Sequence, residues 1–250
     1  DPSFVGGLQY TSRTTSLLKP SMIAYWLSEL GQKNIVGLEK SSVIPSDIAS
    51  TAHASDFVYN TTHDKLGCWT TAYSRKFYED NGFFLKKGGL EICRKGDDAR
   101  WEELKRKVGS GKAFGTNVRL ISASEAKEKF PLLDEESLMG AMWDPDAGLV
   151  IPRSQDVVSF AVESAKDKGA LKTFTDTPAI DFEVENGRVT GVKTDKGFIR
   201  TDKVVICSGI WGPLMGKKAG VPVPRWRRAA LGRRAARSRR TAKGVFLCRR

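Results

Sequence analysis

The chain has 250 residues, of which 40% are hydrophobic and 28% are charged, so it can bury a core and a disordered chain is excluded. Its formal net charge of +12 would indicate a polyanionic partner if the charge were spread over the surface. However, eleven of the 41 Lys and Arg residues lie between Arg225 and Arg250, a stretch without acids, and 30 basic and 29 acidic residues precede it. We therefore expect a nearly neutral domain over residues 1–224 and a basic, low-complexity, disordered tail over residues 225–250.

The four cysteines exclude two further classes of protein. Cys68, Cys93, Cys207 and Cys248 are too widely spaced for a zinc site or a dense disulfide scaffold. No apolar run approaches the roughly 18 residues that a transmembrane helix needs, and no signal peptide is visible. We expect no metal site, no membrane partner and a reducing compartment.

The first predicted elements are a helix and a buried strand. Apolar residues recur at helical spacing from about Ser21 to Leu30, and Gly31 ends this helix. The apolar run from Asn34 to Glu39 predicts a strand of a parallel sheet that ends on an acid. A polar loop is expected over residues 41–62. Further helices are predicted over residues 68–79, 99–109 and 155–168, and from the capping box of Ser122 and Glu125.

The pattern then changes to an alternation of apolar and polar residues. Between Ala179 and Arg200 it predicts a three-stranded meander, with turns at Asn186-Gly187 and Lys196-Gly197. The apolar strand from Val204 to Cys207 follows and ends in a small-residue turn, as expected where a sheet returns to a ligand crevice.

This order of elements, with five sequence segments, resembles the dimethylglycine and sarcosine dehydrogenase/oxidase family over about residues 21–224. The segments are 22–40, 49–54 (Ala-Ser-Thr-Ala-His-Ala), 88–91 (Gly-Gly-Leu-Glu), 130–133 (Phe-Pro-Leu-Leu) and 187–224, which includes Ile-Cys-Ser-Gly-Ile-Trp-Gly at 206–212. The resemblance implies an α/β FAD-binding dinucleotide fold with an inserted β-meander. It also implies FAD-dependent oxidation of an N-methyl amine such as dimethylglycine or sarcosine, by hydride transfer to the flavin.

The resemblance implies a set of cofactor-binding residues and leaves the catalytic residues unknown. Glu39 ends the strand at which such folds hold the ribose of the adenosine half, and Lys40 follows it. The alternative for Glu39 is a solvated surface acid. Ser50, Thr51 and His53 match a segment in which the family's histidine carries the flavin covalently, whereas an ordinary loop histidine is the alternative.

The second part of this set lies after the returning strand. Ser208, Gly209 and Trp211 would approach the flavin, because a residue without a β-carbon permits close contact. A simple strand-to-helix turn is the alternative for this segment. The ring of Trp211 is expected to serve packing rather than chemistry.

The sequence departs from the family pattern at both ends, so the expected fold is incomplete there. The glycine-rich phosphate loop should fall on residues 15–20, which contain no glycine, and the apolar first strand is missing because residues 12–15 are polar. After Pro224 the family's later segments and the folate domain of its longer members are absent, as a frameshift would produce. We therefore expect a truncated chain that binds FAD poorly and turns over little substrate.

Two other functions are compatible with the same residues. The chain could be a non-enzymatic remnant, or its basic tail could bind nucleic acid, although Trp226 and Phe246 are the only aromatic residues of that tail and no nucleic-acid module surrounds them. Nucleic acid is the less favoured partner. The expected location is cytoplasmic, or mitochondrial if the chain is eukaryotic.

Overall fold

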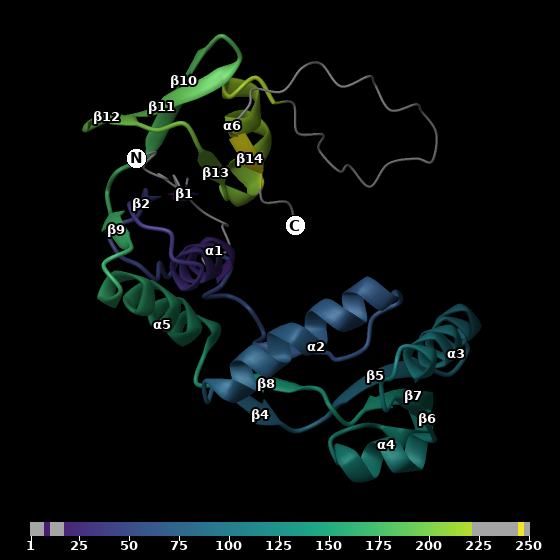
Figure 1. The fold of residues 1–250 in the computed structure, drawn as a ribbon. Coiled ribbons are helices and arrows are strands. Elements are labelled where there is room, and N and C mark those ends of the chain that lie inside the picture. The colour runs from purple at the N-terminus through teal and green to yellow at the C-terminus, as the bar shows by residue number, and fades with distance from the viewer. Residues whose placement is uncertain (1–7, 11–17, 222–244, 248–250) are drawn as a thin grey trace. The chain divides into compact units, whose positions relative to one another are not determined.

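The computed structural model describes residues 8–10, 18–221 and 245–247. The chain divides into two compact units, unit 1 with residues 1–54 and 154–250 and unit 2 with residues 55–153. Figure 1 traces both along the sequence. No helix within the described ranges is long and apolar enough to cross a membrane.

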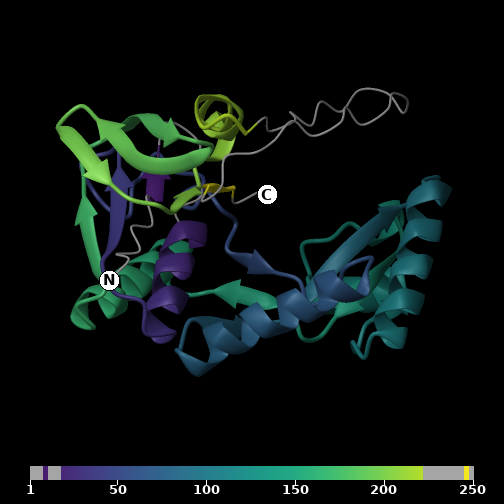
Figure 2. The ribbon, with the colours of Figure 1, turned by 45° about the horizontal axis from the view of Figure 1, so that its top comes forward.

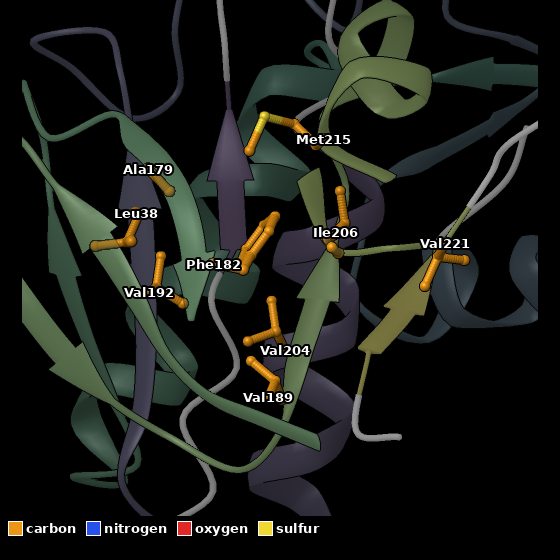
Figure 3. Packing of buried hydrophobic residues seen from close by; sticks show 10 residues of the cluster. Leu38, Ala179, Phe182, Val189, Val192, Val204, Ile206, Met215 and Val221 are labelled. Carbon is orange, nitrogen blue, oxygen red and sulfur yellow. The ribbon is translucent and has the colours of Figure 1, made fainter. Parts of the chain in front are cut away.

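Unit 1 is built on parallel strands. β2 (Ile35–Glu39) lies between β1 (Leu8–Tyr10) and β9 (Leu171–Phe174), and both neighbours run parallel to it. β13 (Val204–Ile206) pairs in parallel with β14 (Val245–Leu247) and also contacts β1. The arrows of β1, β13 and β14 point the same way in Figure 3. The carboxyl ends of these strands therefore meet at one edge, which we call the carboxyl edge.

Two helices cover one face of these strands. Ala24 of α1 (Leu18–Glu29) and Val158 of α5 (Ser154–Asp167) are fully buried in one cluster with Ile35 of β2. Small side chains at these contacts allow close packing of α1 and α5. α5 has the one-sided apolar pattern expected from the sequence, and this prediction is confirmed.

The meander covers the opposite face. It consists of β10 (Ala179–Glu185), β11 (Arg188–Thr194) and β12 (Gly197–Arg200), and α6 (Gly212–Lys218) packs beside it. Leu38 faces this cluster because it lies three positions from Ile35 along β2. Figure 2 shows the meander and the pair α1 and α5 on opposite sides of β2, and Figure 3 shows the packed side chains.

The tight turn of the meander has the backbone that its sequence demands. Asn186 and Gly187 have φ angles of 48° and 73°, the left-handed region required at both central residues of a type I′ turn. The hairpin between β10 and β11 is thereby fixed in register, with Glu185 opposite Arg188. The predicted three-stranded meander is confirmed.

Unit 2 contains two antiparallel sheets and three helices. α3 (Asp98–Ala113) packs on one of these sheets through Leu104, and the predicted capping box starts α4 (Ala123–Lys129), where the Glu125 N–H donates to Ser122 Oγ at 3.1 Å. The sheets are β3 (Phe57–Val58), β8 (Gly148–Val150) and β4 (Phe84–Lys86), and β5 (Gly89–Arg94), β7 (Leu138–Asp144) and β6 (Arg119–Ile121). The helices are α2 (Lys65–Asp80), α3 (Asp98–Ala113) and α4 (Ala123–Lys129), with a 3-10 turn η1 (Glu135–Ser137).

Three expectations from the sequence need correction. The first parallel strand is not missing, because β1 lies at Leu8–Tyr10, upstream of the polar residues 12–15. The stretch 41–62 is not only a loop, because Phe57–Val58 form β3. The basic tail contains β14, although its residues 225–244 and 248–250 lie outside the described ranges.

The core beneath the carboxyl edge provides a stability test. Ile206 of β13 is 1% exposed, and we expect Ile206→Ala to lower the free energy of unfolding by about 2–5 kcal/mol through lost apolar contact and a cavity. Ile180→Ala is the matched control, because Ile180 also lies in a strand but is 47% exposed. Urea unfolding followed by circular dichroism measures both, and equal losses in the two variants would contradict the assignment of this core.

Candidate functional site

The carboxyl group of Glu39 is the most unusual group at the carboxyl edge. Glu39 is the last residue of β2 and is 2% exposed. Its Oε1 accepts a hydrogen bond from the Ser41 N–H at 2.8 Å, whereas its Oε2 is buried and has no hydrogen-bond partner within the described ranges. A buried oxygen without a donor is costly, and this one can accept a hydrogen bond from a ligand.

Burial also changes the protonation of this group. Desolvation raises the pKa of Glu39 to about 7 from its ordinary value of 4.5, while the hydrogen bonds from Ser41 and the charge of Lys40 act in the opposite direction. A donor arriving at Oε2 would stabilise the carboxylate form. The position therefore suits a ligand with hydroxyl groups, such as the vicinal diol of a ribose.

Residues that the sequence reasoning did not single out hold Glu39 in place. Its backbone carbonyl accepts from the Thr177 N–H at 2.9 Å, and Ser46 Oγ donates to Ser41 Oγ at 3.0 Å or accepts from it. Ser46 and Thr177 are both buried. A serine two positions after a strand-terminal acid is a signal that could have identified Ser41. The contact of Thr177 is set by the fold, and no local pattern predicts it.

The segment 49–54 lies in the same unit and forms consecutive turns. Thr51 is buried, and its Oγ1 accepts from the Leu18 N–H, the first amide of α1, at 3.2 Å. Thr51 therefore satisfies one of the amides that are unpaired at a helix start, across 33 positions of sequence. Ser50 is half-buried and His53 is exposed, so the imidazole is accessible.

The segment after β13 brings a second buried hydroxyl to the carboxyl edge. Ser208 is 1% exposed, and its Oγ has no hydrogen-bond partner in the part of the chain that the structure describes. Gly209 has a φ of 52° and begins the 3-10 turn η2 (Gly209–Trp211), in which the Trp211 N–H donates to the Ser208 carbonyl at 2.9 Å. The sharp turn uses the freedom of glycine at a left-handed backbone position.

The residues predicted to bind the cofactor therefore fall into a buried group and a more exposed group. Glu39 ends β2 and Ser208 follows β13, and each has a buried oxygen without a hydrogen-bond partner among the residues that the structure describes. Lys40 and His53 are exposed, while Trp211 is half-buried, in line with the packing role expected for its ring. The interpretation of Glu39 as a solvated surface acid is wrong, because its side chain is buried.

Comparison with known proteins assigns a family to most of the chain. A family model described as DAO, FAD dependent oxidoreductase, matches residues 21–235. Human mitochondrial sarcosine dehydrogenase is 29% identical in an alignment of length 218 that covers 80% of this chain and 22% of that protein. Human mitochondrial dimethylglycine dehydrogenase is 25% identical in an alignment of length 209 that covers 81% of this chain and 23% of that protein.

Two further proteins that are similar to this chain are not sarcosine or dimethylglycine dehydrogenases. The mitochondrial regulatory subunit of pyruvate dehydrogenase phosphatase from Mus musculus is 29% identical in an alignment of length 201 that covers 78% of this chain and 22% of that protein. L-proline dehydrogenase from P. horikoshii has a similar structure, with a TM-score of 0.73 and 27% identity, over 87% of this chain and 57% of that chain. The chain spans about a fifth of the length of these curated relatives.

The raised pKa of Glu39 predicts a pH-dependent stability. The folded chain keeps the proton up to about pH 7 and the unfolded chain releases it near 4.5, so stability falls as the pH rises through this window and then levels off. Relative to Glu39→Gln, we expect the wild type to lose about 2–3 kcal/mol of unfolding free energy between pH 5 and pH 8. Urea unfolding at both pH values measures this loss, and Glu163→Gln, at an exposed acid of α5, is the control. A constant difference between wild type and Glu39→Gln would contradict the assignment.

Proposed function

Because the chain belongs to the family of FAD-dependent oxidoreductases, we propose that it is part of a flavoprotein that oxidises an N-methyl amine such as sarcosine or dimethylglycine. Two of its relatives are dehydrogenases of these compounds, at 29% and 25% identity. The observation that carries the proposal is the buried Glu39 carboxyl group with an unsatisfied oxygen at the end of β2. Bound FAD would accept a hydride from the substrate carbon next to nitrogen.

The described residues fit the adenosine half of FAD. Glu39 Oε2 would accept a hydrogen bond from a ribose hydroxyl and so satisfy an oxygen that has no donor within the described ranges. Thr51 fixes the start of α1, whose amide dipoles favour a phosphate nearby. Ser208 would offer its buried hydroxyl at the same edge.

The segment that would bind the pyrophosphate of FAD matches its ligand less well than Glu39 matches the ribose. The residues between β1 and α1, Thr-Ser-Arg-Thr-Thr-Ser-Leu at 11–17, contain no glycine. Such a segment offers hydroxyl groups and one guanidinium instead of the close backbone approach that glycines allow. We therefore propose that FAD binds, but more weakly than to a glycine-rich loop.

A second candidate function is flavin binding without turnover. One relative of similar identity is a regulatory subunit. Release of formaldehyde from sarcosine or dimethylglycine, in the presence of FAD and an artificial electron acceptor, would support the oxidase proposal. Saturable FAD binding without formaldehyde release would favour the second candidate. We further propose a mitochondrial location if the chain is eukaryotic, and a cytoplasmic one otherwise.

The role of Glu39 predicts a pH-dependent affinity for FAD. Since a ribose hydroxyl favours the carboxylate, and the free protein holds the proton up to about pH 7, affinity should rise between pH 6 and pH 8. At pH 8 we expect Glu39→Gln to bind FAD about ten-fold more weakly, because a charge-assisted hydrogen bond becomes a neutral one. Quenching of FAD fluorescence measures the affinity. Glu163→Gln should bind as the wild type does, and an unchanged affinity of Glu39→Gln would contradict the ribose contact.

The accessible imidazole of His53 leads to a separate proposal, that it is the site of covalent flavin attachment. Protein incubated with FAD and precipitated with acid should retain yellow colour in the pellet, and His53→Ala should release it. His63→Ala is the matched control, because it replaces the other histidine of the chain, which lies in unit 2. Colourless wild-type pellets, or retention in His53→Ala, would show that the histidine carries no flavin.

A further inference from the structure

Unit 2 contains a pocket of about 500 Å³ whose lining residues all lie between positions 59 and 107. One part of its wall is apolar and is formed by Tyr59, Leu90 and Ile92. The other part carries charged and polar side chains, among them Glu91. The volume lies within the range of small-molecule sites.

The charged part of the pocket has more donors than acceptors. Glu91 Oε2 accepts from Arg100 Nη2 at 2.8 Å, and Glu91 Oε1 accepts from Lys107 Nζ. Arg100 Nη1 donates to Glu103, a partly exposed acid, at 2.9 Å. One half-buried acid therefore faces two cations, and their side chains have further N–H groups that donate to no other described residue.

The surplus of hydrogen-bond donors is unusual because one of the two cations, Lys107, is buried. Lys107 is 8% exposed, and its Nζ lies 5.3 Å from the centre of the Tyr59 ring. A lysine is seldom so deeply buried, and the single bond to Glu91 uses one of its three N–H donors. A ligand oxygen in the pocket could use the others.

Thr61 supplies an independent observation. It lines the pocket and is 1% exposed, and its Oγ1 has no hydrogen-bond partner within the described residues. Its methyl carbon lies 2.8 Å from the position that a β-carbon at Gly111 would take, so α3 approaches Thr61 closely there. The buried hydroxyl is therefore held in place and unsatisfied.

From these contacts we propose that the pocket binds a small organic carboxylate with a compact apolar body. The carboxylate would accept hydrogen bonds from Lys107, Arg100 and Thr61, and the apolar body would contact Tyr59, Leu90 and Ile92. Glu103 also pairs with Arg100, so the two cations and two acids have no net charge, and hydrogen bonding in the pocket suits a singly charged carboxylate better than a doubly charged phosphate. No residue of unit 1 contributes, so the proposal is independent of the proposed FAD chemistry.

Benzoate, titrated into the full chain by calorimetry without FAD, tests the proposal. We expect saturable binding with a Kd of about 1 mM or lower. Benzamide and benzylamine should bind at least ten-fold more weakly, because the first lacks the charge and the second reverses it. Inorganic phosphate should also bind more weakly. No binding of benzoate, or equal binding of benzamide or phosphate, would overturn the assignment to a carboxylate.

Variants separate binding from a structural role of the same residues. Thr61→Val keeps the methyl contact, removes a hydroxyl that has no partner within the described residues, and should weaken benzoate binding about five-fold without lowering the melting temperature. Lys107→Met should abolish binding, with Lys105→Met, at a more exposed lysine of the same helix, as its control. Should Lys107→Met fail to fold, Thr61→Val decides alone, and unchanged benzoate affinity in that variant would overturn the proposal.

Discussion

The burial of the Glu39 carboxyl group is the constraint on which unit 1 depends. Strand β2 ends between two parallel neighbours, so its last side chain is removed from solvent by the same packing that forms the sheet. Desolvation raises the pKa of this carboxyl group to about 7, which means that the folded chain carries an acid that water no longer stabilises. A fold that retains such a group is less stable alone than with a ligand that donates to it.

The remaining features of the carboxyl edge follow from this geometry. The Ser41 N–H satisfies one oxygen of Glu39, and Thr51 joins the segment after β2 to the first amide of α1. Ser208 comes to the same edge because β13 contacts β1 on the side away from β2. Core residues such as Leu38 and Ile206 hold these strands together, so the site depends on apolar packing for its positions.

Features of the fold and the site that depend on neighbouring residues could be predicted from the sequence, whereas contacts between residues far apart in the sequence could not. The strand ending at Glu39, the helix α5 and the turn at Asn186-Gly187 follow from local patterns, and the structure confirms them. β1 was not predicted because it has only three residues and takes its identity from pairing with β2. The contact of Thr51 with Leu18 joins residues 33 positions apart, and no local signal marks it.

The acid in each unit has different partners, and this difference determines which ligands suit the two units. Glu91 in unit 2 pairs with Arg100 and Lys107, and Arg100 also pairs with Glu103; both cations line a pocket and have N–H groups that no described residue accepts, so the surplus there is of hydrogen-bond donors. Glu39 in unit 1 has no ion-pair partner among the described residues, and its Oε2 is a surplus acceptor. A hydroxyl-bearing ligand therefore complements unit 1 and an anionic one complements unit 2, because each supplies the partner that the folded unit lacks.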